Sequence, residues 1–477
     1  MILQKNKLKQ SLKHLISSCG LNISKLSKVN YSIYKLHSIK NFKEKLEEIK
    51  RLIKKYPNDP KTHFELVKCL QEMCDPYQFE ALREYGNVRE KWLKETGFDQ
   101  LDIEFVHPDL VVGAFGSYYA IENLIRANEL GLRKKRKLFL LMPKNAKFRN
   151  LTMSEYFKKY INFVNAEDLS RELYSLEYFL TVPAGHCTPL KNECLPVEIA
   201  ANRCEQEVQK RKLNYSTFNL NEEHYEKGVN FLKTCGLPKD SWYVTIHVRE
   251  PGYRSETVKN STEGFRNANP LNYIKAIKRI INSGGWVFRM GDPSMTPLPK
   301  IKGLIDYAHS PLKSELLDVF LLATSKFLVG TASGPLRIPG FFGVPIMLTN
   351  NIRHLQYYSL KQQDLFMPRL IKKISNKKNI KLEQMLSKPT SFYIYESQFK
   401  GSGLYWEENS PEDIEFSVIE MLERIDQTEN KLNNYPLTKE QLEFKKIAEA
   451  EGGNFAISVE AFTPCSKHFL NNNADIF

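Results

Sequence analysis

The sequence lacks several of the patterns that mark common functional classes. It contains no G-x-G-x-x-G and no Walker A motif, which argues against dinucleotide-dependent oxidoreductases and P-loop enzymes. Its eight cysteines form no C-x-x-C pair, so we expect free thiols in a reducing compartment and no metal site. No stretch of about 18 to 20 apolar residues occurs, and we therefore expect neither a transmembrane helix nor a secretory signal.

Positive charge is concentrated at the start of the chain. Of the formal charge of +14, residues 1–40 carry +8, because they contain eight lysines and no Asp, Glu or Arg. Leu8, Leu12 and Leu15 recur at helical spacing, which predicts a basic amphipathic helix. This helix is either a solvated leader or a contact with an anionic membrane surface, so we expect a protein that is cytoplasmic or peripheral at the inner face of the cytoplasmic membrane. Nucleic acid is not an expected partner, because the leader lacks interleaved aromatic residues and no helix-turn-helix or zinc-finger pattern appears.

The chain is long enough for two or three core-forming units, since it has 477 residues. Residues 41–97 show helical periodicity interrupted by a Tyr-Pro-Asn-Asp-Pro turn, and they resemble one and a half tetratricopeptide units. Such arrays need several repeats to bury their faces. We therefore expect this helical region to dock on its neighbour instead of forming a binding groove.

From Pro108 onward, apolar runs alternate with helical patterns. The pattern predicts a strand in "DLVVGAFG", a helix in "SYYAIENLIRANELGL" that begins at Ser117 and ends at Gly131, and a strand in "KLFLLMP". This β–α–β order implies a parallel sheet, and "FLTVPAGH" is expected to add a strand. A second half begins at "SWYVTIHVRE" and continues with the helix "NPLNYIKAIKRIINSG", the strands "GWVFRMGD" and "KFLVG", and the helix "NSPEDIEFSVIEML".

The predicted fold is α/β, with two Rossmann-like domains that face a cleft and a small α-helical region before them. We expect four segments: a basic leader and tetratricopeptide-like region (1–104), a first α/β domain (105–235), a second α/β domain (236–425), and a C-terminal segment that packs back on the first domain (426–477).

Polar or glycine-rich residues follow four predicted strands of the second half. Ligands of open parallel sheets bind beyond the carboxyl ends of the strands, so these residues should converge. Two arginines, main-chain amides and a hydroxyl suit a diphosphate with a sugar, although a histidine at such a position can also be an ordinary core residue. The glycine-rich stretch "GTASGPLRIPGFFGVP" is either a tight turn or an anion cradle formed by a strand, a turn and a helix. The four sets are His247, Arg249 and Glu250; Arg289, Gly291 and Asp292; Thr331, Ser333, Gly334 and Pro335; and Thr349 and Asn350.

Four stretches carry a family resemblance that covers roughly residues 105–477. They are "IHVREPGYR", "FRNANPLNYIKAIKRIINSGGWVFRMGD", "DVFLLATSKFLVGTASGPLRIPGFFGVPIMLTN" and "ENSPEDI", and they resemble bacterial glycosyltransferases associated with surface-polysaccharide genes. The chain is also distantly similar to fucosyltransferases with a His-x-Arg motif, which His247 and Arg249 match. The resemblance implies the two-domain GT-B fold, a donor diphosphate contacted by Arg249, and a donor-phosphate turn at 333–335. Glu250, Pro251 and Gly252 depart from the usual continuation of the fucosyltransferase motif.

The chain has no Asp-x-Asp motif, which disfavours the metal-dependent single-domain architecture. We expect no metal and no cofactor other than the nucleotide-sugar substrate, with arginines and helix N-termini stabilising the departing nucleoside diphosphate. The general base should come from the acceptor side, where the turn formed by Gly113, Gly116, Ser117 and Tyr118 is expected. His186 and Glu250 are the catalytic candidates, and Glu250 can equally be a solvated loop carboxylate.

The predicted activity is transfer of a sugar from a nucleotide sugar to a glycan or lipid-linked acceptor in surface polysaccharide synthesis. In this prediction, the first α/β domain binds the acceptor and the second binds the nucleotide sugar. The alternative is a non-catalytic scaffold that binds carbohydrate with its α/β part or a protein with its tetratricopeptide-like helices.

Overall fold

The computed structural model describes most of the chain and divides it into two compact units. The described residues are 32–36, 38–73, 75, 77–113, 115–165, 181–191, 193–251, 264–351, 361, 363–393, 396–428, 435–452 and 463–477. The first unit comprises Met1–Arg149 and Ser154–Cys204, and the second comprises Asn150–Met153 and Glu205–Phe477. Within the described ranges, no helix has the length and apolar character needed to cross a membrane. Most of the basic leader, residues 1–31, lies outside these ranges.

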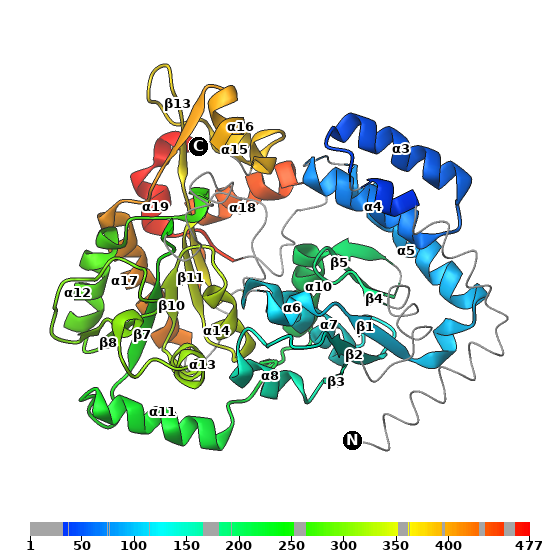
Figure 1. Cartoon of the computed structure of the whole chain (residues 1–477). Helices are drawn as coiled ribbons and strands as arrows, with labels where there is room; N and C mark the ends of the chain where they lie inside the picture. Colours follow the sequence, from blue (N-terminus) through cyan, green and yellow to red (C-terminus); the bar gives the residue numbers. More distant parts are fainter. Residues whose placement is uncertain are drawn as a thin grey trace. The chain divides into compact units, whose positions relative to one another are not determined.

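The first unit is built on a parallel sheet with strand order β3-β2-β1-β4. Helix α7 (Tyr118–Glu129) connects β1 to β2 and buries Ile121 and Leu124 (Figure 1). Gly131 ends this helix in the left-handed conformation, with φ of 68°. The strands are β1 (Ile103–Val106), β2 (Lys137–Met142), β3 (Ile161–Asn165) and β4 (Thr181–Val182). The shorter elements are η1 (Phe98–Leu101), α6 (Asp109–Val112), η2 (Phe115–Ser117), α8 (Leu151–Phe157), β5 (Cys187–Pro189), β6 (Cys194–Pro196) and α10 (Val197–Lys210).

Helices α3 (Phe42–Lys55), α4 (Pro60–Glu72) and α5 (Gln78–Glu95) precede this sheet. Helix α5 docks on the β5–β6 hairpin, α4 packs on α5, and α3 packs on α4. Asn41 and Asp59 cap α3 and α4, since each side chain accepts hydrogen bonds from backbone N–H groups of the first turn. A Cβ on Gly86 of α5 would lie 2.6 Å from Cys194 Cβ, so the helix can approach the hairpin because it has glycine here. The expectation that the helical region docks on its neighbour is confirmed.

A buried carboxylate joins these helices to the first sheet. Glu104 on β1 is 1% exposed and is surrounded by arginines. Arg136 Nη1 at 2.8 Å and Arg89 Nη2 at 3.3 Å donate to its Oε1, and Arg133 Nη2 donates to its Oε2. Burial alone would raise the pKa of Glu104, but the arginine charges outweigh burial and lower the pKa to about 2.

The second unit is built on a larger parallel sheet with strand order β12-β11-β10-β7-β8-β9. Its strands are β7 (Tyr243–His247), β8 (Trp286–Arg289), β9 (Leu304–Ile305), β10 (Leu328–Gly330), β11 (Ile346–Asn351) and β12 (Leu365–Pro368). Every residue of β7, β10, β11 and β12 is buried. Continuous burial is typical of a parallel sheet covered on both faces.

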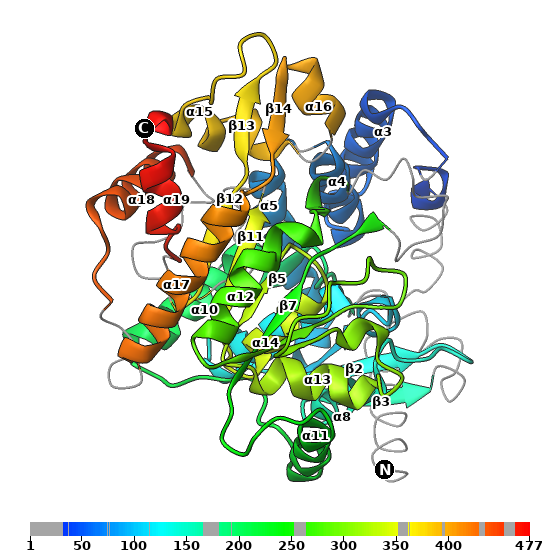
Figure 2. The same ribbon diagram turned by 90° about the vertical axis from the view of Figure 1, so that its left-hand side faces the viewer.

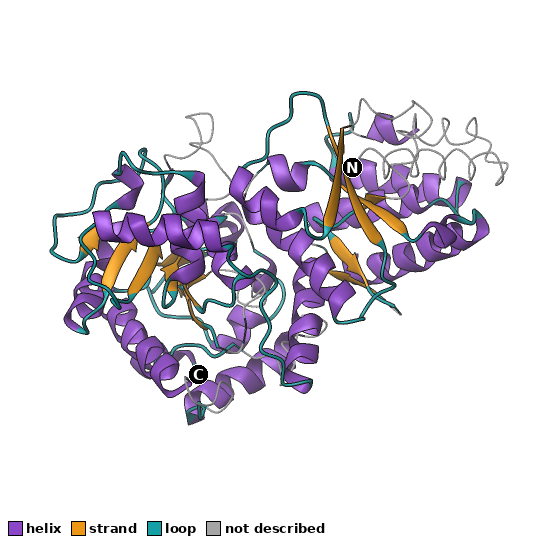
Figure 3. Ribbon diagram, turned by 90° about the horizontal axis from the view of Figure 1, so that it is seen from below, coloured by secondary structure: helices purple, strands orange, loops and turns teal. Residues whose placement is uncertain are grey.

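Helices cover both faces of this second sheet. Helices α12 (Ile274–Asn282) and α17 (Pro411–Thr428) pack together on one face, and α13 (Glu315–Thr324) and α14 (Ile338–Phe341) lie on the other (Figures 1 and 3). Asn269, Ser314 and Ser410 accept backbone hydrogen bonds at the starts of these helical segments. Figure 2 shows α17 and α12 side by side. The remaining elements are α11 (Glu222–Thr234), η6 (Gly264–Arg266), η7 (Pro270–Tyr273), η8 (Tyr307–His309), η9 (Pro335–Arg337), β13 (Leu370–Lys373), α15 (Leu382–Leu386), η10 (Thr390–Phe392), α16 (Glu396–Gly401), β14 (Leu404–Glu407), α18 (Lys439–Gly452), α19 (Lys467–Asn472) and η13 (Ala474–Ile476).

The predicted α/β fold with two parallel-sheet halves is confirmed, but one strand was wrong. The "DLVV" run forms the one-turn helix α6, and the strand before it is β1. Apart from the short segment Asn150–Met153, the second compact unit begins at Glu205, whereas a boundary at 235/236 is expected from the sequence.

The C-terminal segment lies in the second unit, whereas residues 426–477 were expected to pack on the first domain. Helix α18 contacts α15, and α19 contacts α17. Gln441 Nε2 donates to Glu420 Oε1 at 3.0 Å and to the carbonyl of Cys465 at 2.7 Å. Cys465 in turn forms a parallel bridge with Phe366 of β12. Buried hydrogen bonds to α17 and β12 therefore fix the segment to the second unit.

Candidate functional site at the strand ends of the second unit

The loops that follow β7 and β10 are held directly against each other. The backbone N–H of Arg249 donates to Thr331 Oγ1 at 2.9 Å, and the backbone N–H of Thr331 donates to the carbonyl of His247 at 3.1 Å. A Cβ on Gly330 would lie 2.4 Å from that carbonyl oxygen, so β10 needs glycine at its last position. Two of the predicted strand-end sets, those of Arg249 and Thr331, are thus brought together.

The Arg249 side chain is oriented by a second arginine that the sequence analysis missed. Arg249 Nη1 donates to Asn267 Oδ1 at 2.5 Å, and the Asn267 carbonyl accepts a hydrogen bond from Arg369 Nη2. Arg369 directly follows β12 and is 2% exposed, and its Nε donates to the Asn350 carbonyl at 3.3 Å. Burial lowers the pKa of Arg369 from its usual value, although it stays a cation. Two guanidinium groups therefore share Asn267 at this edge of the sheet.

The turn after β10 carries an unpaired hydroxyl. Ser333 Oγ is buried and has no hydrogen-bond partner among the residues that the structure describes. A buried hydroxyl without a partner costs roughly 1 to 3 kcal/mol, and a phosphate oxygen would provide the missing partner. The helical segment after Gly334 is short, because η9 and α14 together end at Phe341. A helix this short adds little dipole charge at its N-terminus, so an anion bound here would depend on hydrogen bonds from side chains and backbone N–H groups.

Glu250 is engaged in a buried ion pair and is not a solvated loop carboxylate. It is 8% exposed, and its Oε1 accepts from Arg289 Nη2 at 2.9 Å. Its Oε2 accepts from the backbone N–H of Thr296 at 3.0 Å and from Thr296 Oγ1 at 2.5 Å. Arg289 also donates to Asp306 Oδ1 at 3.2 Å. Because both oxygens of Glu250 are occupied, its geometry favours positioning Arg289 over accepting a proton from a substrate.

The other residues after β8 form a local turn. Asp292 Oδ1 accepts from the backbone N–H of Ser294 at 2.9 Å. Gly291 has a φ of 155°, a backbone conformation that residues with a side chain rarely adopt, so this position favours glycine. Gly291 and Asp292 thus shape the turn 291–295.

His247 has the environment of a core histidine, which was the alternative that the sequence left open. It is 4% exposed, and its Nδ1 lies 3.2 Å from the Met290 carbonyl. Burial lowers the pKa of His247 to about 4, so the ring is neutral near pH 7. A neutral, hydrogen-bonded imidazole here stabilises the end of β7 against the end of β8.

Asn350 joins β11 to the segment that begins α17. It has a φ of 54°, which is uncommon for a residue other than glycine. Its side chain and backbone exchange hydrogen bonds with Asn409 at 2.8 and 2.6 Å, and its Nδ2 donates to Tyr273 Oη at 3.2 Å. Tyr273 Oη also lies 2.6 Å from Thr349 Oγ1. These buried contacts make Asn350 a support of the site.

The acceptor-side candidates lie at one edge of the first sheet. Tyr118 is buried, and its Oη donates to the Val111 carbonyl at 3.4 Å. A Cβ on Gly113 would lie 2.7 Å from the Asp109 carbonyl oxygen, while Gly116 and Ser117 belong to η2. A Cβ on Gly185 would lie 3.5 Å from Leu110 Cδ2, which places the loop of His186 beside α6.

A side chain from α4 positions His186. Its Nδ1 lies 2.7 Å from Gln71 Oε1, and with the hydrogen on Nδ1 this oxygen accepts it and Nε2 carries the lone pair. Desolvation and the charge of Lys68 lower the pKa of His186. The neutral ring that results is the form able to accept a proton.

No group of three or more His, Cys, Asp or Glu side chains in the described ranges has an arrangement that could hold a metal ion.

Neither a protein-family model nor a curated protein sequence matches the chain. Among solved structures, it is similar to the bacterial iron-containing dodecameric glycosyltransferase TibC of enterotoxigenic E. coli, with 13% identity and a TM-score of 0.26 over 52% of this chain and 57% of TibC. A glycosyl transferase family 9 structure from Veillonella parvula gives 11% identity and a TM-score of 0.33 over 56% of this chain and 85% of that chain. E. coli ADP-heptose lps heptosyltransferase II gives 13% identity and a TM-score of 0.31 over 56% of this chain and 90% of that chain. The chain thus spans little more than half of TibC, and at these TM-scores the similarities assign no family to it.

Proposed function

We propose that the chain is a GT-B glycosyltransferase that uses a nucleotide-sugar donor. The observation that supports this most is the hydrogen bond that joins the Arg249 backbone to Thr331, two residues before the unpaired Ser333 hydroxyl. A guanidinium and a free hydroxyl are the groups that bind and stabilise a leaving nucleoside diphosphate. Arg369 and Asn267 keep the Arg249 side chain oriented for this role.

The acceptor in this proposal is a glycan or lipid-linked hydroxyl compound of bacterial surface polysaccharide synthesis. His186 is the proposed general base, because its Nε2 lone pair can take the proton of the attacking hydroxyl. The proposal needs no metal ion, since cationic side chains neutralise the diphosphate. The lysine-rich residues 1–40 would hold the enzyme at an anionic membrane surface where lipid-linked acceptors lie.

Isothermal titration against UDP, GDP, ADP and CMP tests the donor site. Wild-type protein is expected to bind one of them with micromolar affinity. Hydrogen bonds to a charged group contribute roughly 1.5 to 3 kcal/mol, so Arg249→Ala should weaken that binding by roughly tenfold to a hundredfold. Arg279→Ala is the matched control, because Arg279 lies on α12 and pairs with Glu415 at 3.3 Å. Absence of binding to every nucleotide would favour the carbohydrate-binding or tetratricopeptide-like scaffold instead.

A further inference from the structure

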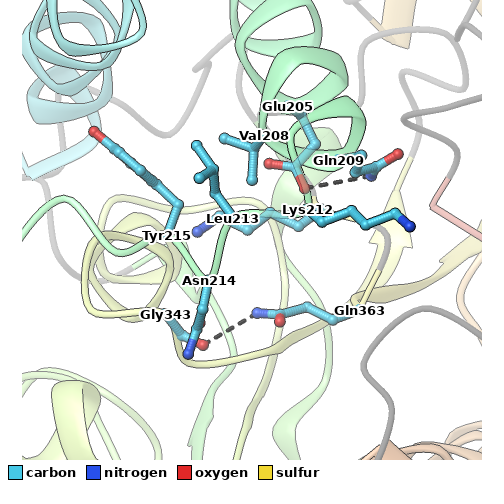
Figure 4. A pocket seen from close by; sticks show the side chains of 10 residues that line it. Glu205, Val208, Gln209, Lys212, Leu213, Asn214, Tyr215, Gly343 and Gln363 are labelled. Atoms are coloured by element: carbon cyan, nitrogen blue, oxygen red, sulfur yellow. Dashed lines mark hydrogen bonds between the residues drawn. The ribbon is translucent and has the colours of Figure 1, made fainter.

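A cavity of about 160 Å³ lies in the second unit (Figure 4). It is away from the candidate site formed by Arg249, Thr331 and Ser333, which we call the strand-end site. The last turns of α10 and the segment that follows them form one wall, and Gly343 and Gln363 lie on the opposite side. Gly343 precedes β11 by three residues, and Gln363 precedes β12 by two. The cavity is therefore at the amino edge of these strands.

The same two strands end at the strand-end site. Asn350 lies near the carboxyl end of β11 and Arg369 directly follows β12. At about 3.3 Å per residue, the six residues of β11 and the four of β12 separate the two sites by roughly 13 to 20 Å. A ligand in the cavity would therefore not touch Arg249 or Ser333, and the cavity is a separate site.

The walls of the cavity offer both hydrogen-bond donors and acceptors. Glu205 supplies a carboxylate whose Oε1 accepts from Gln209 Nε2 at 3.4 Å. Gln363 Nε2 donates to the Gly343 carbonyl at 3.1 Å, which leaves Gln363 Oε1 as an acceptor. Lys212 and Asn214 add an ammonium and an amide on the exposed side of the cavity. Sugar hydroxyls both donate and accept hydrogen bonds, so they can pair with Glu205 and Gln363 as well as with Lys212 and Asn214, whereas the Glu205 carboxylate would repel an anion.

An apolar surface and a strained residue complete the cavity. Val208 and Leu213 line it, and Leu213 is 43% exposed although it is a large apolar side chain. Lys212, between these two residues, has a φ of 53° in the left-handed region. For a residue other than glycine this conformation costs roughly 1 to 2 kcal/mol, and such strain persists where the surrounding structure requires it.

We propose that this cavity binds a single saccharide unit, with the sugar hydroxyls on Glu205, Lys212, Asn214 and Gln363 and the C–H face of the ring on Val208 and Leu213. Its volume of about 160 Å³ and its combination of polar groups with an apolar wall suit a ligand of the size of one sugar ring. The site is independent of the proposed donor site, so either can fail alone.

Saturation-transfer NMR with a panel of neutral hexoses, N-acetylhexosamines, deoxyhexoses and heptoses tests this inference on the full chain. One class is expected to bind, and 10 mM inorganic phosphate should not displace it. The double variant Lys212→Asn/Asn214→Ala should weaken binding roughly tenfold, because it removes two donors while asparagine tolerates the left-handed backbone. Lys239→Gln, an exposed lysine outside the cavity, is the control.

The thermal unfolding midpoint and nucleotide binding of the double variant should equal those of the wild type, which separates loss of the sugar from loss of the fold. Three results would overturn the inference: no sugar of the panel binds, the double variant binds as the wild type does, or phosphate displaces the sugar.

Discussion

Thr331 offers a way to test whether the hydrogen bond between two strand ends controls ligand binding. Its Oγ1 accepts from the backbone N–H of Arg249 at 2.9 Å, and the residue is completely buried. Thr331→Val keeps the shape of the side chain but leaves that N–H unpaired, at a cost of roughly 1 to 3 kcal/mol. Thr331→Ser keeps the hydroxyl and removes only a buried methyl group, which costs about 1 kcal/mol.

The two variants should therefore separate stability from binding. Thr331→Val is expected to lower the unfolding midpoint by roughly 2 to 10 °C. It should also weaken nucleoside diphosphate binding by roughly fivefold or more, because the Arg249 backbone N–H loses its hydrogen-bond acceptor. Thr331→Ser should also lower the midpoint but should bind the nucleotide as the wild type does. Calorimetric unfolding and isothermal titration measure both quantities. Equal nucleotide affinity of the two variants would refute the argument.

Three further changes test other parts of the structure. Glu104→Gln should destabilise the first unit by about 3 kcal/mol at pH 7, because the arginines lose their carboxylate partner. In the wild type, this stabilisation by the Glu104 carboxylate should be lost as pH falls from about 4.5 towards 2. Denaturant unfolding over a pH series measures it, with exposed Glu95→Gln as the control, and equal stability of both variants would contradict the prediction. His247, whose pKa burial lowers to about 4, contributes stability that is complete above about pH 6.5 and decreases as pH falls towards 4, by up to about 3 kcal/mol. The difference in unfolding free energy between wild type and His247→Asn should shift by that amount across this range, and a constant difference would show that the ring is not buried as a neutral group. Deleting residues 1–40 should abolish flotation with anionic liposomes, and unchanged flotation would rule out membrane contact through the leader.

The sequence predicts structure best where a helix or strand depends on residues that are close to one another in the chain. Apolar runs bounded by glycine or charge predicted β7, β8 and β10, and the stretches that contain Asn269 and Ser410 at their starts predicted helices. Such signals arise from local burial and from capping. The sequence analysis failed at β1, because a strand with Glu104 at its centre does not look buried. That carboxylate is neutralised by arginines from distant segments, which no local pattern reveals.

The candidate site shows the same limit. The sequence predicts where the strands end but not which strands lie next to each other. The ion pair between Glu250 and Arg289 on the adjacent strand therefore could not be predicted. Arg369 was missed because the short run before it, "LFMP", ends in proline and gives little strand signal. Its role depends on the Asn267 carbonyl, which is 102 residues away in the sequence. The roles of Glu250 and Arg369 depend on which strands lie next to each other, and the local sequence does not reveal the order of the strands in the sheet.

We propose that the strand ends of the second unit bind a diphosphate. Crystals of the protein soaked with UDP, GDP, ADP and CMP sugars would locate the bound nucleotide. Electron density for a diphosphate is expected within hydrogen-bond distance of the Arg249 guanidinium and of Ser333 Oγ. Density for the nucleotide at any other place, with these two groups untouched, would contradict it.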